Sequence, residues 1–172
     1  QIRCHAPAGL AILGGGGAPE SLAGLGDARL AAALDRLEGL AARYDDVLVD
    51  LPSGVGRLVR SLAARARRLL IVGNDEPTTL TDNYAVIKLT RGFAPPPAFV
   101  ANAVGDAALG VQAHAILRRA CKQFLDLECR HIGTVRRDPR VPAAIRQQMP
   151  LLDRSPQAPA AADLATLTRN LL

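Results

Sequence analysis

The chain has 172 residues, enough for one domain with a substantial core, and 49% of them are hydrophobic. Aromatic residues contribute only 3% and tryptophan is absent, so the core must be built from Leu, Ala, Val and Ile, as in α/β or helical proteins. The formal net charge of +5 comes almost entirely from arginines, which fit solvated helix faces better than a nucleic-acid surface because no basic stripe carries interleaved aromatics.

Short apolar runs alternate with segments of helical period along the chain. In chain order the expected elements are a strand at 10–13, a helix at 27–42, a strand at 47–50, a helix at 56–67, a strand at 69–73, a helix at 79–91, a strand at 98–102, a helix at 106–124, a strand at 131–135, and helices at 138–148 and 158–172. We expect Asp27 to cap the first helix and Thr78 or Thr79 to cap the helix at 79–91. This alternation predicts one α/β domain over residues 1–172, with a mostly parallel sheet and helices on both faces.

Residues 44–56, YDDVLVDLPSGVG, are the most informative stretch for function. The apolar run at 47–49 suits a strand covered on both faces, and Asp50 stands where this strand leaves the sheet, at the edge where open parallel sheets bind ligands. A carboxylate there can hold Mg²⁺ through water, and the backbone N–H of Gly54 can contact a terminal phosphate. A structural alternative stays open, in which Asp50 caps a helix and Gly54 makes a tight turn.

Polar residues follow three further strands and are expected at the same edge of the sheet: 74–76, Asn102 and 136–139. The carboxamide of Asn102 donates and accepts hydrogen bonds at once, so it can read an adenine edge. A simple turn role for Asn102 is the alternative.

No phosphate-binding P-loop of the form G-x-x-x-x-G-K-[ST] occurs in the sequence. The only lysines are Lys88 and Lys122, and neither follows a glycine. The glycine run at 14–17 is followed by Ala18 and Pro19, so it is interpreted as a turn or flexible loop.

The cysteines and histidines do not form a recognisable metal site. Cys4, Cys121 and Cys129 are odd in number and lack C-x-x-C spacing, which argues against a disulfide framework or a zinc site and fits a reducing cytosol. The three histidines have no ligand-like spacing. No signal peptide and no membrane-spanning apolar run is seen, so a cytoplasmic location is expected.

Four segments together resemble the MinD-like branch of the ParA-type P-loop ATPases: YDDVLVDLPSG, NDEPTTLTDNYAVIKL, FVANAV and HIGTVRRDPRVPAAIRQQMPLL. The second and fourth are the most specific. A run E-P-T-x-[LI]-T-D-x-Y-A-x-I-K followed by D-P-x-[VL]-x-x-A-[IV]-R-Q-Q-x-P is typical of the flagellar-number regulators called FlhG or FleN. The resemblance extends from about residue 10 to the end and implies a SIMIBI-type P-loop NTPase fold whose N-terminal part is missing here.

Carried onto this sequence, the resemblance gives Asp50 the role of holding Mg²⁺ through water and Gly54 the contact with the γ-phosphate of ATP. Asn102 matches the residue that reads adenine, and three residues would lie beside the base: Arg136, Asp138 and Pro139. The family's usual I-P is V-R at 135–136 of this chain, so the wall beside the base departs from the pattern. The resemblance assigns no catalytic residue within this sequence.

The family's P-loop, its lysine, its Mg²⁺-ligating Ser/Thr and its catalytic aspartate all precede the matched part, and none is in this sequence. The family's P-loop strand lies between the strands that match 47–50 and 69–73, so without it two edges would be unpaired. Either an upstream segment exists elsewhere, or residues 10–13 or a second chain fill the gap, or the sheet pairs differently. We expect the chain alone to be a dimer or larger, or poorly soluble, and to be inactive as an ATPase.

The resemblance implies a FlhG/FleN-like regulator of flagellar number or placement that dimerises with ATP/ADP and Mg²⁺ when a P-loop segment is present. The implied partners are a second copy, a flagellar transcription activator or basal-body protein and, transiently, the inner membrane. Two alternatives stay open: a non-catalytic, P-loop-less binding module, and a ParA-type partitioning or cargo-positioning ATPase. The helix at 158–172 has an apolar face but one basic residue, so it is interpreted as a packing helix, not a membrane anchor.

Overall fold

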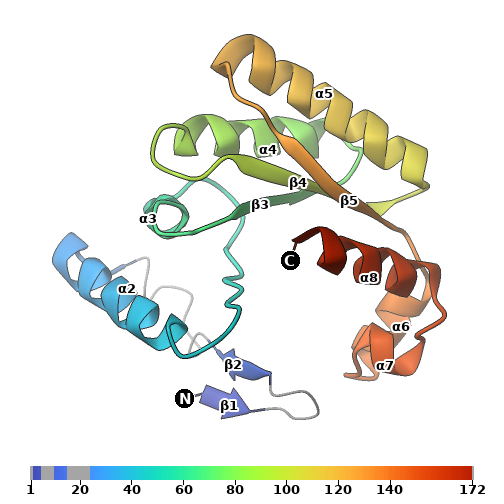
Figure 1. Ribbon diagram of the computed structural model, residues 1–172, viewed down its shortest axis with the longest axis horizontal. Helices are drawn as coiled ribbons and strands as arrows, with labels where there is room; N and C mark the ends of the chain where they lie inside the picture. The colour runs from blue at the N-terminus through green and yellow to red at the C-terminus, as the bar shows by residue number, and fades with distance from the viewer. Residues whose placement is uncertain (1, 5–9, 15–23, 172) are drawn as a thin grey trace. The chain divides into compact units, whose positions relative to one another are not determined.

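The computed structural model describes residues 2–4, 10–14 and 24–171 (Figure 1). The chain divides into two compact units, which are described separately: residues 1–52 with 56–62, and residues 53–55 with 63–172. The larger unit holds the parallel sheet and most of the expected site residues.

The larger unit is built on a parallel three-stranded sheet in the order β3–β4–β5. Its strands are β3 (Leu69–Gly73), β4 (Pro97–Val104) and β5 (Arg130–Arg136). Helix α4 (Pro77–Thr90) joins β3 to β4, and α5 (Ala107–Leu125) joins β4 to β5. Parallel neighbours need such crossovers because each strand must begin again at the same end of the sheet. The α/β class expected from the sequence is confirmed.

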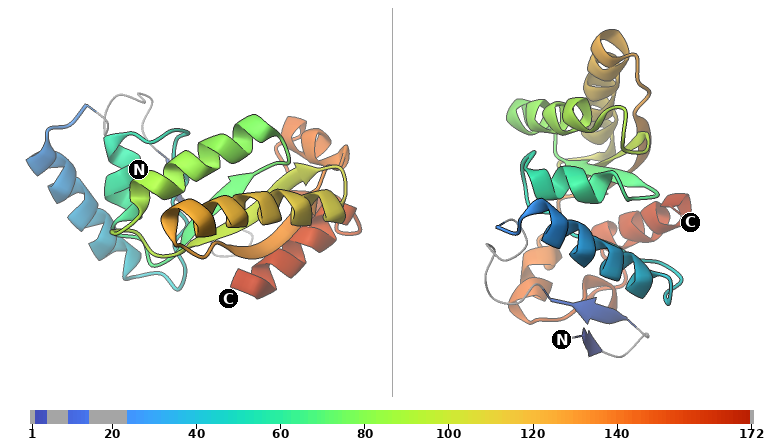
Figure 2. Two further views of the ribbon diagram at one scale, coloured as in Figure 1. Left: turned by 90° about the horizontal axis from the view of Figure 1, so that it is seen from above. Right: turned by 90° about the vertical axis from the view of Figure 1, so that its left-hand side faces the viewer.

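Helices cover both faces of this sheet (Figures 1 and 2). α4 and α5 lie on one face, and α8 (Pro159–Leu171) lies on the other, against β5. The short helices α6 (Arg140–Arg146) and α7 (Leu151–Arg154) connect β5 to α8; α7 was not expected from the sequence. The Asn170 side chain donates to the carbonyl of Ile132 at 2.7 Å, so α8 is a packing helix, as expected.

The core of the larger unit lies between the sheet and helices α4 and α5. Phe99 of β4 and Leu117 of α5 are 0% and 1% exposed. The helical period explains the buried face of α5, whose innermost residues are spaced four apart: Ala113, Leu117, Cys121 and Leu125. On β3 the alternation of a strand applies, so that Ile71 is buried whereas the next residue, Val72, is 56% exposed.

The smaller unit contains an antiparallel ribbon of β1 (Ile2–Cys4) and β2 (Ala11–Leu13), together with α2 (Asp27–Ala41) and all but the last residue of α3 (Arg57–Ala63). Leu30 and Leu34, one helical turn apart, are the buried residues of α2. The Arg57 guanidinium donates to the Asp27 carboxylate and to the carbonyl of Leu25, which ties α3 to the start of α2. The strand expected at 10–13 is confirmed, whereas β1 was not expected.

The strand expected at 47–50 is wrong. These residues have no regular structure, and Val47, Leu48 and Val49 are 50%, 87% and 56% exposed. A strand needs a partner for its backbone N–H and C=O groups, and no strand in the described part of the chain pairs with this segment. An apolar run predicts a tendency to be buried, but it cannot supply the neighbouring strand.

The expected helix caps are also wrong. Gly26 is the N-cap of α2, and Asp27 is the first helical residue, with no side-chain cap hydrogen bond at this end. Helix α4 begins at Pro77, which places Thr78 and Thr79 inside its first turn. Proline is favoured at the first helical position because its fixed φ suits the helix and its missing N–H has no partner to lose.

Candidate functional site

The carboxyl ends of β3, β4 and β5 lie at one edge of the sheet because the strands are parallel. Each strand is followed there by a polar turn. After β3 the Asn74 side chain accepts the backbone N–H of Glu76 at 3.0 Å, and after β4 the Asp106 side chain accepts the N–H of Leu109 at 2.9 Å and caps α5. The side chains of Asn74 and Asp106 thus stabilise these two turns through hydrogen bonds within the protein.

Asn102 is exposed near the end of β4, opposite Val135 of β5. The next residue, Ala103, has a φ of 56°, and the pairing of the two strands shifts at this point. Arg137 fixes the irregularity, since its backbone N–H donates to the carbonyl of Val104 at 2.7 Å and its Nε donates to the carbonyl of Ala103 at 3.3 Å. Asn102 is therefore exposed beside a stretch of backbone that two hydrogen bonds from Arg137 hold in place. Its amide can donate and accept hydrogen bonds at once, as recognition of a base requires.

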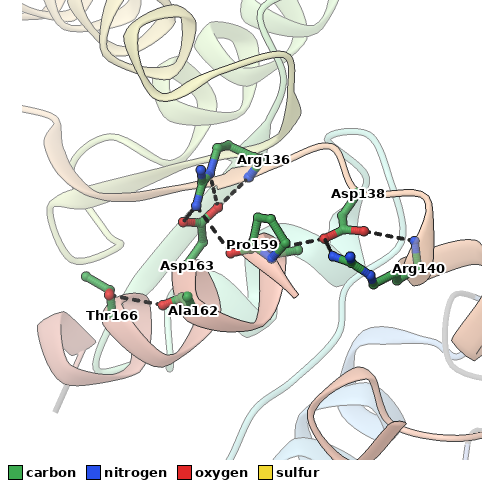
Figure 3. A network of polar contacts seen from close by, with 8 residues as sticks. Arg136, Asp138, Arg140, Pro159, Ala162, Asp163 and Thr166 are labelled. Carbon is green, nitrogen blue, oxygen red and sulfur yellow. Dashed lines mark hydrogen bonds and ion pairs between the residues drawn. The ribbon is translucent and has the colours of Figure 1, made fainter. Parts of the chain in front are cut away.

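Arg136 is paired inside the protein, with Asp163 of α8 (Figure 3). Its Nε and Nη2 atoms donate to the two carboxylate oxygens at 2.8 Å each, and its backbone N–H donates to Oδ2 at 3.0 Å. This bidentate arrangement is the strong form of an ion pair. The hydrogen bond from the Arg136 side chain is the main reason that the pKa of Asp163 lies below its ordinary value. The pair fastens α8 to the end of β5.

Asp138 is 4% exposed and organises two helix starts (Figure 3). Its Oδ1 accepts the backbone N–H of Arg140, the first residue of α6, at 2.9 Å, and its Oδ2 accepts the backbone N–H of Ala160 in the first turn of α8 at 3.4 Å. The bond from the Arg140 N–H is the largest cause of a pKa below the ordinary value for Asp138. Pro139, the N-cap of α6, is exposed beside it.

Asp50 and Gly54 belong to different units of the chain. Asp50 is exposed in the irregular segment after α2. Gly54 has a φ of 100°, which L-residues rarely adopt, so the expected glycine-dependent turn is present. Their expected roles toward Mg²⁺ and phosphate remain predictions.

The expected site residues at the sheet edge differ in whether their polar groups are already engaged within the protein. Asn102 offers an exposed amide to a base, whereas the carboxylate of Asp138 and the guanidinium of Arg136 are already engaged within the protein. No lysine follows a glycine anywhere in the sequence, and in the described ranges no group of three His, Cys, Asp or Glu residues could hold a metal ion. The expected role of Asn102 toward a base therefore stays a prediction, as do the expected roles toward phosphate and Mg²⁺.

Two histidines and two cysteines gather between α5 and the start of β5, away from the carboxyl ends of the strands. The rings of His114 and His131 stack with centroids 4.8 Å apart, and His114 Nε2 lies 2.8 Å from the carbonyl of Cys129. Burial, followed by the nearby His114, lowers the pKa of His131. Cys121 and Cys129 are both 0% exposed and belong to the core, whereas the two histidines are half-buried beside it.

Sequence reasoning missed Asp163, whose partner lies 27 positions earlier in the chain. It also missed why position 73 is a glycine: a Cβ there would lie 2.1 Å from Nδ2 of Asn83 on α4. Asn83 Nδ2 is buried without a hydrogen-bond partner among the described residues. No sequence signal marks such contacts, because they depend on how closely α4 approaches the sheet.

Among the helices that the structure describes, none is long and apolar enough to cross a membrane. Comparison with solved structures finds the MinD cell division protein of Aquifex aeolicus, with a TM-score of 0.61 and 21% sequence identity over 81% of this chain and 58% of that one. This similarity supports the fold.

Two curated relatives extend the comparison to sequence. The chain is 28% identical to the antiactivator FleN of Pseudomonas aeruginosa over 156 residues, which are 90% of this chain and 56% of FleN. It is 24% identical to the flagellum site-determining protein YlxH of Helicobacter pylori over 86% of this chain and 51% of that protein. The chain thus spans about half the length of these curated relatives.

A family model described as cellulose biosynthesis protein BcsQ matches residues 17–172, which is most of the chain. The match includes the whole β3–β4–β5 sheet and its helices, and the MinD-like fold agrees with it. We conclude that the chain belongs to the BcsQ family, within the wider group of MinD/ParA-type proteins.

Proposed function

We propose that this chain acts as a FlhG/FleN-like regulator of flagellar number or placement. The observation that carries the proposal is the position of the two segments most typical of such regulators. Residues 74–89 and 131–152 come from separate parts of the sequence, and both cross the same carboxyl edge of the sheet, at the starts of α4 and α6. The similarity to FleN and to the flagellum site-determining protein supports this proposal.

We propose further that the regulator works by ATP-dependent dimerisation when a P-loop segment accompanies this chain. This chain would then be the C-terminal part of the ATPase domain. Asn102 would read the adenine, with Pro139 beside the base. Arg136 and Asp138 would shape the wall of the site through Asp163 and the two helix starts, without touching the nucleotide themselves. Asp50 would hold Mg²⁺ through water and Gly54 would face the γ-phosphate once the P-loop segment is present; bound Mg²⁺ would neutralise phosphate charge.

The proposed location and partners follow from the same proposal. The chain would work in the cytoplasm, with transient contact to the inner membrane, and its partners would be a second copy and a flagellar transcription activator or basal-body protein. Nucleic acid is not proposed as a partner, since the arginines are scattered along the sequence.

A non-catalytic binding module is the second candidate. The specific observation in its favour is that the side chains of Arg136 and Asp138 are both engaged within the protein. In this case Asp50 and Asn102 would have no role in nucleotide chemistry. A ParA-type positioning protein for other cargo would share the fold and differ in its partner.

A chimera tests the proposal. This chain replaces the matched region of FleN in Pseudomonas aeruginosa, and electron microscopy counts flagella per cell while an immunoblot checks the protein level. We expect the chimera to return the flagellar number of a strain without FleN to that of the parent strain. A stable, abundant chimera that leaves the number unchanged would contradict a flagellar role and favour another cargo.

Variants of the chimera separate the two mechanisms. Asp50→Ala and Asn102→Ala should abolish its effect if nucleotide binding is required, whereas a non-catalytic module would tolerate both. Arg119→Ala is the matched control, because Arg119 is exposed on α5 at a distance in sequence from every proposed site residue.

A further inference from the structure

Two phenylalanines are exposed close to the amino ends of β4 and β5. The chain has three phenylalanines, of which Phe99 is 0% exposed in the core. Phe93 is 44% exposed in the turn after α4, and Phe124 is 65% exposed in the last turn of α5. Leu89, in the last turn of α4, is 44% exposed as well. Exposed apolar side chains that gather in one place mark sites of interaction, so we name these three residues the amino-edge surface.

The last turns of α4 and α5 bring the amino-edge surface together. Both helices run from the carboxyl edge of the parallel sheet to its amino edge, because each connects one strand to the next. The two helices pack against each other, and Figures 1 and 2 show their last turns side by side. α5 packs on β4 and β5, so a strand added beside β3 would lie away from Phe124. The exposure of Phe124 therefore does not depend on what pairs with β3.

Ordered turns hold the phenylalanines at this edge. Gly92 has a φ of 91°, in the left-handed region that favours glycine, and the carbonyl of Thr90 accepts the backbone N–H of Phe93 at 3.4 Å. Asp126, the C-cap of α5, has a φ of 47° and ends the helix two residues after Phe124. The backbone thus fixes where the two rings emerge, so little order would have to be gained on binding.

Basic residues outnumber acidic residues at the same edge. Lys122 pairs with Asp126 at 2.8 Å, and Arg118 pairs with Glu128. The pKa of Asp126 lies below its ordinary value, mainly because Lys122 donates to its carboxylate and also because Arg91 is nearby, so the ends of α4 and α5 share one electrostatic environment. Three further basic residues are exposed and have no ion-pair partner in the described part of the chain: Lys88, Arg91 and Arg130.

We propose that the amino-edge surface is a docking site for an acidic amphipathic segment of a partner protein. The apolar side chains of that segment would cover Phe93 and Phe124, and its carboxylates would face the three exposed basic residues. Charge complementarity favours such a segment over a second copy of this chain, whose same surface is equally basic. It also favours a protein over a lipid bilayer or a nucleic acid, because their uniform negative charge would lie against Asp126 and Glu128.

Three labelled peptides test the docking site on the 172-residue chain without nucleotide. Each has about 18 residues, or about five helical turns, with Leu along one helix face and Glu, Gln or Lys at all other positions. Fluorescence anisotropy measures each Kd, and the Glu peptide should bind about tenfold more tightly than the Gln peptide, with the Lys peptide weakest. Phe124→Ser should weaken binding of the Glu peptide about tenfold, because apolar contact is lost. Ile116→Ser is the matched control, since Ile116 is 59% exposed on α5 outside this surface, and it should leave the Kd unchanged.

Reversal of charge makes the test independent of the phenylalanines. The double variant Lys88→Glu with Arg91→Glu should prefer the Lys peptide to the Glu peptide, and circular dichroism checks that it stays folded. In about 1 M NaCl, where the Debye length is about 3 Å, the Glu and Gln peptides should bind the unmodified chain alike.

Several results would overturn the proposal. These are no binding of the Glu peptide, equal binding of the Glu and Gln peptides at low salt, or an unchanged order of peptides in the double variant. Tighter binding to phosphatidylglycerol vesicles or to a single-stranded oligonucleotide than to the Glu peptide, lost in Phe124→Ser, would overturn it by identifying another class of partner. The proposed function is tested separately by the chimera, because the amino-edge surface lies at the opposite edge of the sheet from Asn102.

Discussion

Gly110 tests how closely α5 packs on the sheet. This glycine is buried on α5, and a Cβ added to it would lie 2.3 Å from Oγ1, 2.5 Å from Cγ2 and 3.0 Å from Cβ of Thr134 on β5. All three distances are too short for atoms that do not bond. Gly110→Ala should therefore force α5 away from β5 or push Thr134 out of its preferred rotamer, in a place where the β-branched side chain has little freedom.

Two opposing terms set the magnitude. Alanine improves helix propensity over glycine by about 1 kcal/mol, and overpacking of a core costs about 1–3 kcal/mol. Because several atoms of one side chain are too close, we take the upper end of that range, so Gly110→Ala should lower the free energy of unfolding by about 2 kcal/mol. Thr134→Ala removes the two closest atoms, so the double variant should recover most of the loss.

Urea denaturation followed by circular dichroism gives the free energies for the double-mutant cycle. Gly39→Ala is the control, because Gly39 lies in α2 with nothing within 4 Å of its added Cβ, and this change should slow hydrogen exchange of α2 amides. If Gly110→Ala stabilises the protein, or if its effect simply adds to that of Thr134→Ala, the close approach of α5 to β5 is refuted.

The remaining predictions concern chemistry and pH. The isolated chain should release no phosphate from ATP above a blank without protein, because it lacks the phosphate-cradling lysine; release that Asp50→Ala abolishes would contradict this. Burial and the nearby His114 hold the pKa of His131 below its ordinary 6.5. The unfolded state therefore binds this proton more readily than the folded state, so the free energy of unfolding should fall as pH drops below about 6.5. In His131→Phe the urea midpoint should depend less on pH over this range. Asp163→Asn should speed hydrogen exchange of α8 amides, because it removes the ion pair with Arg136. The pKa of Asp163 is lower in the folded state than its ordinary 3.8, so the unmodified chain should lose stability as pH falls below 3.8, and this variant should lose less. Unchanged α8 exchange would show that the ion pair does not hold the helix.

Part of the candidate site followed directly from sequence order. Asn102 and Asp138 were expected at one sheet edge, and they lie there, because parallel strands place all their carboxyl ends together. What each side chain contacts did not follow. Asp138 accepts N–H groups from the starts of α6 and α8, and its expected place beside a base stays a prediction. The second of these helices begins 21 residues after Asp138, so no local pattern connects them.

The sequence by itself determined the alternation of strands and helices in the larger unit, because the spacing of apolar residues and the turn residues are local properties. β3 was expected at its observed bounds, and β4, α5 and β5 were expected within a few residues of theirs. Tertiary structure decided the rest. Residues 47–49 are as apolar as β3, but β3 has a neighbour in β4 and they have none among the described strands, so one segment is a strand and the other is irregular and exposed. A strand is stabilised by hydrogen bonds to another strand, and that partner is not encoded in the strand's own residues.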